Sequence, residues 1–171
     1  DATGNASITA ADINNGSSDN CGIDTTAIDI TDFDCTMIGA NTVTLTVTDA
    51  SGNTDTCSTT VTIEDITAPT PDQTTITLVA DQCEILATDI TAPTATDNCG
   101  GTVTVTNDAT FPITAQGTTV ITWSYEDVNG NISTQTQNVY INDISSPTPD
   151  AATLANITAE CEVLATDITA P

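Results

Sequence analysis

Oxygen-bearing side chains are the residues of this sequence that could do chemistry. The pentapeptide Asp-Ile-Thr-Ala-Pro occurs at 65–69, 89–93 and 167–171, and a near copy occupies 143–147. Glu64 directly precedes the first copy, and residues 127–131 read Asp-Val-Asn-Gly-Asn. Calcium takes about 6–8 oxygen ligands from carboxylates, amides and carbonyls. The sequence therefore predicts calcium as a cofactor, with seven candidate ligands: Glu64, Asp65, Asp89, Asp127, Asn129, Asn131 and Asp143.

A second interpretation of these residues needs no ion. Asp and Asn are common in tight turns because their side chains hydrogen-bond the local backbone, so the same residues could simply shape solvated turns. The joint that follows the second unit has Asn142 where the first has Glu64. It therefore has one carboxylate fewer and is expected to bind calcium more weakly. Asp97 would join the ligand set only if residues 91–101 form a loop instead of a strand.

The charge balance excludes several functions. The chain has 24 acidic residues, no Lys, Arg or His, and a formal net charge of −24. Nucleic-acid binding is not expected, because contacts to phosphates need Lys and Arg. Membrane insertion is not expected either, because no apolar run is long enough to span a bilayer. A Ser, Thr or Cys nucleophile would lack a His or Lys base, so the protein is predicted not to be an enzyme.

The sequence repeats itself at a shift of 78 residues. Asp19-Asn20-Cys21-Gly22 aligns with residues 97–100, and Asp49–Asn53 aligns with Asp127–Asn131. Such self-similarity is typical of tandem repeats. We divide the chain into a first unit (1–69, lacking its start), a complete second unit (70–147) and the start of a third (148–171). Both ends of the sequence fall inside units, which predicts a window on a longer array.

Each unit is predicted to be all-β, an antiparallel sandwich of the immunoglobulin class with seven strands. In the second unit the strands are expected near 73–80, 84–90, 94–98, 102–106, 109–115, 118–126 and 132–142. Apolar residues alternate with polar ones in the later strands, so one face is expected to be buried. The residues of that face are Val43, Leu45, Val47, Ile121, Trp123, Tyr125, Val139 and Ile141.

Seven antiparallel strands would place the two ends of a unit at opposite poles. The units should then follow one another head to tail and advance by roughly 30–40 Å each. The turn 127–131 is expected at the pole that faces the joint after Glu64, with Asp89 at the same pole. This position would bring the candidate calcium ligands together between neighbouring units, which are the expected partners of each unit.

The six cysteines predict disulfides. Cys83 and Cys99 are symmetric about Thr91, so a bend there would allow a Cys83–Cys99 bridge to close the antiparallel pair 84–90 and 94–98. Asn5 occupies the position equivalent to Cys83, so Cys21 needs another partner. Cys21–Cys35 is the preferred pairing and Cys35–Cys57 competes with it; partners of Cys57 and Cys161 are expected outside this sequence. Disulfides indicate an oxidising, extracellular setting.

Two stretches resemble a known repeat. The run TATDNCGGTVTVTNDATFPITAQGTTVITWSYEDVNGN resembles the hyalin-type (HYR) repeat, a short immunoglobulin-like module. The run GANTVTLTVTDASGNTDTCSTTVTIEDITAP resembles the form in large secreted adhesins of gliding flavobacteria, the SprB type. The resemblance implies type IX secretion and an adhesive or filament-forming role at the cell surface. One departure from the four-cysteine members is Gln135, which stands where the first unit has Cys57.

Two functions remain open from the sequence. In the first, the repeats form a non-catalytic, calcium-stiffened stalk or filament that displays a distal adhesin for gliding or attachment. In the second, the repeats are themselves the adhesive module and bind a glycan or another cell-surface protein.

Overall fold

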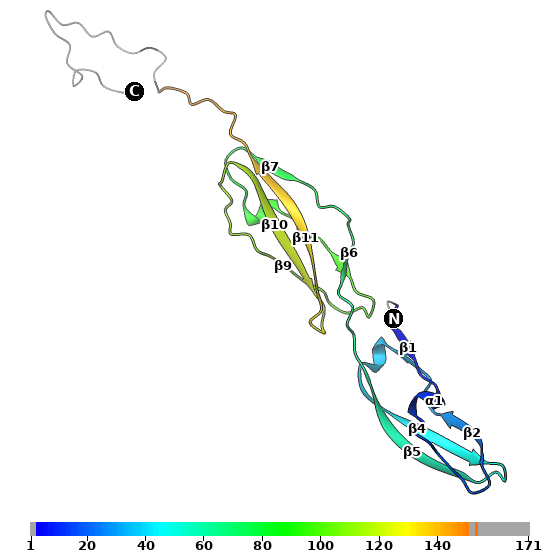
Figure 1. The fold of residues 1–171 in the computed structure, drawn as a ribbon. Helices are drawn as coiled ribbons and strands as arrows, with labels where there is room; N and C mark the ends of the chain where they lie inside the picture. The colour runs from blue at the N-terminus through cyan, green and yellow to red at the C-terminus, as the bar shows by residue number, and fades with distance from the viewer. Residues whose placement is uncertain (1–2, 151–152, 154–171) are drawn as a thin grey trace, which may run out of the picture.

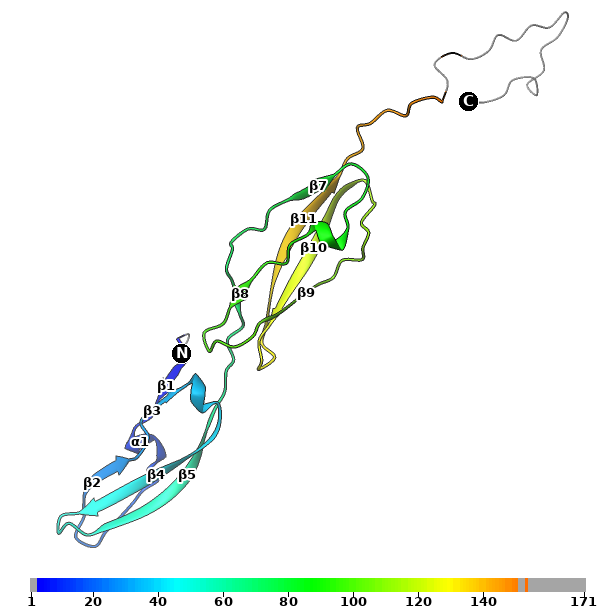
Figure 2. The same cartoon turned by 180° about the vertical axis from the view of Figure 1, so that it is seen from behind.

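The computed structural model describes residues 3–150 and residue 153, and its architecture is all-β. Figures 1 and 2 show two elongated bodies arranged end to end. The segment around Gly4 lies beside the joint between these bodies, next to Asn98 and Cys99 of the second body, so both ends of the described part of the first body lie near the joint. We keep the names first unit and second unit for the parts before and after Pro69. The predicted start of a third unit, with Cys161, lies almost entirely outside the described residues.

The first unit contains two small sheets. Its strands are β1 (Asn5–Ser7), β2 (Ile23–Ile28), β3 (Asp32–Asp34), β4 (Gly39–Asp49) and β5 (Thr54–Ile63). A short helix α1 (Ala10–Ile13) follows β1, and a 3-10 turn η1 (Cys35–Met37) follows β3. The strands β2, β4 and β5 form an antiparallel sheet in that order, and β1 pairs with β3.

The second unit contains a larger sheet. Its strands are β6 (Thr70–Pro71), β7 (Val79–Asp81), β8 (Ala95–Thr96), β9 (Thr104–Asn107), β10 (Gly117–Glu126) and β11 (Ile132–Ile141), with a 3-10 turn η2 (Ala87–Asp89). The main sheet has the order β7-β11-β10-β9, and β6 pairs with β8. Several sheets in one elongated unit are consistent with a β-sandwich.

The long hairpins of the two units are alike. Gly39 pairs with Ile63 at the start of the β4–β5 ladder, and Gly117 pairs with Ile141 at the start of β10–β11. The alternating apolar pattern and the turn residues 127–131 predict the hairpin of the second unit, and the aligned residues 49–53 make the equivalent turn in the first. Seven of the eight residues predicted to face the core are buried; Val47 is half-buried.

The core of the second unit packs around the β10–β11 hairpin. Its buried members are Ile85, Ile113, Ile121, Trp123, Tyr125, Val139 and Ile141. The Trp123 indole donates a hydrogen bond to Gln137 Oε1 over 2.9 Å, and Gln137 Nε2 donates to the carbonyl of Thr77 over 2.8 Å. Buried amide groups need such partners. Gln137 therefore ties the segment before β7 to the centre of the hairpin.

The prediction of seven antiparallel strands per unit is wrong in the first half of the second unit. No strand forms over 84–90 or 109–115; only one bridge, Ile85–Ile113, joins them. Asp89, Asn107 and Asp108 accept hydrogen bonds from nearby backbone N–H groups. Such side-chain contacts offer the backbone an alternative to ladder bonds. In addition, β7 runs parallel to β11, because both strands run from the joint towards the far pole.

Candidate metal centre at the joint

The joint is formed by the linker 64–69 and two loops of the second unit. The hairpin turn 127–131 faces the linker as predicted, and Asn131 Nδ2 donates a hydrogen bond to the carbonyl oxygen of Asp65 over 3.0 Å. Ser133 at the start of β11 donates a hydrogen bond to the carbonyl of Pro69. The loop 97–101 lies between β8 and β9 at the same pole. Contacts of the linker with the second unit therefore fix the chain where it passes between units.

A disulfide crosses the joint. Cys35 in η1 of the first unit is bonded to Cys99 in the loop 97–101 of the second, with Cα atoms 5.2 Å apart. The predicted pairings Cys83–Cys99 and Cys21–Cys35 are therefore wrong, as is the competing Cys35–Cys57. Cys21, Cys57 and Cys83 are exposed free thiols. Cys83 and Cys99 do not meet because the antiparallel pair expected to bring them together does not form.

Gly4 passes directly against this disulfide. Its φ of +77° lies in the left-handed region, and an added Cβ would lie 2.5 Å from the Sγ of Cys35. A side chain at this position would collide with a sulfur that the disulfide holds in place, so glycine is required for the close approach.

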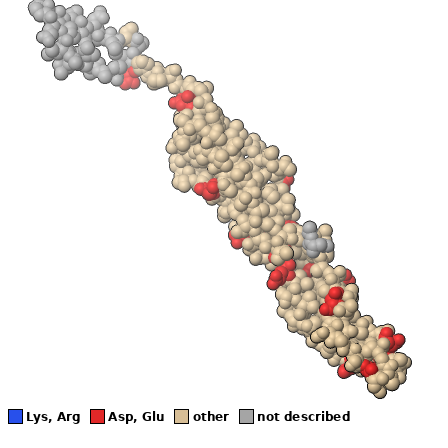
Figure 3. Space-filling view, viewed as in Figure 1, with Lys and Arg blue, Asp and Glu red and all other residues tan. Residues whose placement is uncertain are grey.

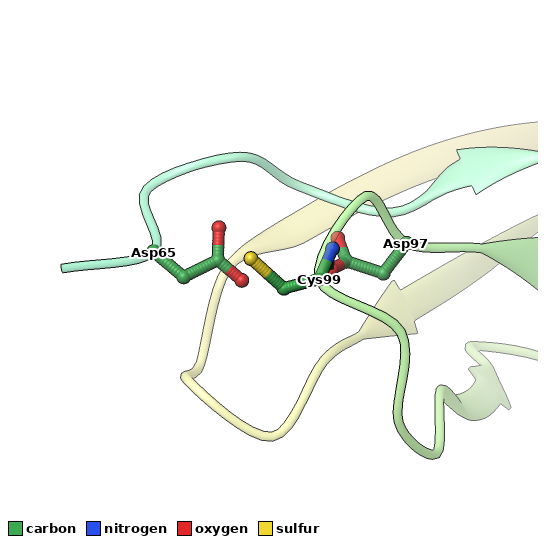
Figure 4. A group of neighbouring side chains, drawn as sticks. All are labelled: Asp65, Asp97 and Cys99. Carbon is green, nitrogen blue, oxygen red and sulfur yellow. Dashed lines mark hydrogen bonds between the residues drawn. The ribbon is translucent and has the colours of Figure 1, made fainter. Parts of the chain in front are cut away.

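Among the residues that the structure describes, three buried oxygens at the joint have no hydrogen-bond partner. They are Oδ2 of Asp65, Oδ1 of Asp97 and Oδ1 of Asn98. Oxygens of the two carboxylates and the sulfur of Cys99 all lie within 4.8 Å of one another, and Figure 4 shows Asp65 on one side with Cys99 and Asp97 on the loop opposite. Asp65 comes from the linker, whereas Asp97 and Asn98 come from the loop of the second unit. The group is thus shared between the two sides of the joint.

Each of the two carboxylates has one oxygen in use and one unpaired. Asp65 Oδ1 accepts from the N–H of Thr67 over 3.1 Å, and Asp97 Oδ2 accepts from the N–H of Cys99 over 2.8 Å. Two negative charges at about 5 Å repel by roughly 3 kcal/mol where the effective dielectric constant is about 20. Asp97 is only 7% exposed, and the chain has no cationic side chain to offset its charge. This arrangement suits a bound cation.

The structure does not gather the predicted ligand set as a whole. Glu64 is exposed at the end of β5, next to Asp65. Asp89 ends η2, where its carboxylate accepts from the N–H of Leu86, and lines a pocket of the second unit. Asp143 is exposed, and its carboxylate accepts from the N–H of Ser145. Only Asp65 of the predicted ligands belongs to the cluster with unpaired oxygens.

The predicted ligands of the turn 127–131 have a different role. Asp127 Oδ1 accepts from the N–H groups of Asn129 and Asn131, and Oδ2 accepts from Asn131 Nδ2, each over 2.8 Å. Asp49 and Asn53 repeat this pattern in the first unit. The carboxylate of Asp127 is therefore fully engaged within its own turn, and Asn129 contributes its backbone N–H while its side chain is exposed.

These turns predict a dependence of stability on pH. Burial alone raises the pKa of Asp127, but hydrogen bonds from Asn131, Asn129 and Gly130 outweigh it and lower the pKa below the usual value. A lowered folded-state pKa stabilises the protein above the unfolded pKa of about 4, and the effect is lost as pH falls through the folded value. Melting temperatures between pH 5 and pH 2 should fall less steeply in Asp127→Asn than in the wild type. Parallel curves would contradict this.

Asp97 is the carboxylate of the cluster that the candidate ligand list lacked, and Asn98 follows it with a buried, unpaired Oδ1. The condition attached to Asp97 is met, since β8 ends at Thr96 and residues 97–101 form a loop. The repeated Asp-Asn-Cys-Gly could have indicated the turn at Asp97. Asp19 and Asp97 each accept a hydrogen bond from the backbone N–H two residues later. A repeated turn gives no indication that its second carboxylate oxygen is buried in one unit and exposed in the other.

Comparison with known families agrees with the resemblance of the second unit. Residues 66–141 match the family model described as an HYR-like domain with 4 cysteines. The second unit is similar to HYR-type repeats. Such domains are extracellular and of the adhesion type. The HYR-like segment contains Cys83 and Cys99, and its disulfide leads out of the segment to Cys35.

Two further observations bear on the setting of the chain. No curated protein matches the sequence. Among the described residues, no helix is long and apolar enough to cross a membrane.

Proposed function

We propose that this chain is a non-catalytic spacer segment of an extracellular adhesion protein, forming part of a stalk or filament at a cell surface, in attachment or gliding. The observation that carries the proposal is the disulfide Cys35–Cys99, which joins two successive units across their joint. A spacer has to hold its units in a fixed arrangement. The hydrogen bonds from Asn131 and Ser133 to the linker also hold the second unit in place against the linker.

The surface of the protein supports a structural role. Carboxylates lie in small groups along the visible face, and no positive side chain interrupts them (Figure 3). High net charge of one sign keeps chains apart in solution. Eight described aspartates have a lowered pKa through contacts with nearby residues: Asp12, Asp29, Asp34, Asp49, Asp72, Asp81, Asp108 and Asp127. Their role is thus in turns and strand ends, which favours a scaffold over a reaction site.

Small-angle scattering of the oxidised protein tests whether the two units are held in a fixed, extended arrangement. We expect a pair-distance distribution with a second maximum at roughly 30–40 Å, the advance of one unit. After reduction, the distribution should broaden because the units can reorient about the linker. A single compact maximum in the oxidised protein would contradict the spacer.

A cleft at the joint favours a second candidate function, in which the repeats themselves bind a partner. The cleft is lined by apolar side chains of the first unit and the linker, among them Phe33, Ile38 and Ile66, and Ile66 is 81% exposed. Exposed apolar groups of this kind occur at interaction sites. A glycan array and a pull-down with cell-surface proteins test this candidate, with Ile66→Ser as the variant expected to weaken binding. Capture that is unchanged by this variant would exclude the cleft.

A further inference from the structure

We propose that Asp65, Asp97 and Asn98 form a calcium site that bridges the two units. The site deepens the proposed spacer function, on whose joint it rests, and differs from the ligand set expected from the sequence. The proposal rests on three buried oxygens that have no hydrogen-bond partner, and on the two carboxylates that come from opposite sides of the joint.

Burial makes a cation the physically reasonable partner. Charged carboxylates are rarely buried unless they are paired or bind a metal. Asp97 is more than nine-tenths buried, its Oδ1 has no hydrogen-bond donor, and a carboxylate oxygen of Asp97 lies within 4.8 Å of one of Asp65. The chain has no Lys, Arg or His at any position, so no side chain can supply the missing charge. A cation from solution removes the repulsion between Asp65 and Asp97.

The donor atoms select the class of cation. The sulfur of Cys99 is held in the disulfide and is not a thiolate, the form that binds metals. The remaining donors are oxygens, which suit hard cations. Calcium tolerates irregular geometry, whereas magnesium requires a near-ideal octahedron. With three protein oxygens and water in the other positions, we expect a dissociation constant of about 10⁻⁴–10⁻³ M, the range of extracellular calcium modules.

The chain supplies a matched control for this site. Asp19 is the equivalent of Asp97 one repeat earlier, and Asp143 is the equivalent of Asp65 one repeat later. Both make the same turns as their counterparts, to the N–H groups of Cys21 and Ser145. Both are exposed and absent from the cluster. Asp→Asn changes at either pair remove two charges and leave an oxygen to accept the turn hydrogen bond.

The test is calorimetric titration with calcium chloride and thermal unfolding in 10 mM calcium or in chelator, at constant ionic strength. The wild type should show saturable binding and a rise in Tm of about 3–10 °C, because bound ligand stabilises the folded state by mass action. Asp65→Asn/Asp97→Asn should lose the binding heat and the rise in Tm. Asp19→Asn/Asp143→Asn should keep both. Magnesium at the same concentration should give a smaller rise.

Two results would overturn the calcium site. One is the absence of saturable heat in the wild type, and the other is an equal response of the two double variants, which would indicate general screening of the charge. Mapping of the disulfide and scattering in chelator test the spacer separately. An intact Cys35–Cys99 bond and an extended shape without calcium binding would remove the site and leave the spacer standing.

Discussion

Replacing Cys35 by Ser is expected to lower the free energy of unfolding of the oxidised protein by about 4 kcal/mol. The bond that is lost joins residues 64 positions apart, and closing a loop of this length restricts the unfolded chain strongly. The same change also frees η1 from the loop 97–101, so the two units should reorient more widely. Chemical denaturation followed by circular dichroism measures the first effect, and scattering measures the second.

Cys57→Ser is the matched control for this variant. Cys57 lies in β5 of the same unit, and its thiol is exposed and unpaired. We expect its replacement to change the free energy of unfolding by less than about 0.5 kcal/mol. Peptide mapping without reductant should recover Cys35 joined to Cys99. Equal stability of the two variants, or recovery of Cys83 joined to Cys99, would contradict the disulfide across the joint.

Replacing Trp123 by Ala is expected to destabilise the second unit by about 3–5 kcal/mol, the usual cost of removing a large buried aromatic side chain. Trp123 is 4% exposed and lies among the buried residues of β10 and β11. The variant leaves a cavity and also removes the donor for Gln137 Oε1. A buried acceptor without a partner adds to the loss.

Two further variants divide this effect into its parts. Trp123→Phe keeps most of the apolar volume but removes the indole N–H, so we expect a smaller loss of about 1–3 kcal/mol. Val120→Ala is the control on the same strand, because Val120 is 56% exposed; it should cost less than about 1 kcal/mol. Urea denaturation curves compare the three. A Trp123→Ala loss as small as that of Val120→Ala would contradict the assigned core.

The sequence predicted those parts of the fold that depend on local pattern. Alternation of apolar and polar residues over 10 or more positions identified β4 and β10, because a strand with one buried face repeats every two residues. The strands predicted around Ile85 and Ile113 do not form. Their apolar residues are buried, but side-chain oxygens of neighbouring Asp and Asn residues take backbone donors that a ladder would need.

The candidate site was predictable only in part. Asp65 and the position of the joint followed from the repeat and from the expected poles of each unit. The bond between Cys35 and Cys99 did not, because their spacing in sequence gives no measure of how two units pack. Asp127 was misassigned for another reason. Its oxygens are engaged by Asn131 and Asn129, and an Asp-rich turn has the same composition whether or not its oxygens are free.

The disulfide has a mechanical consequence for a chain pulled from both ends. Tension entering at Cys35 can pass through the sulfur–sulfur bond to Cys99 and bypass the 64-residue separation between them. The enclosed segment holds β4, β5, the linker and the part of the second unit from β6 to β8, and it would otherwise lengthen by up to roughly 220 Å when unravelled. Under oxidising conditions the disulfide prevents the enclosed segment from extending. A load therefore enters the second unit after Cys99 and leaves it through β11, so it bears first on the main sheet, where β9 and β11 pair with opposite edges of β10.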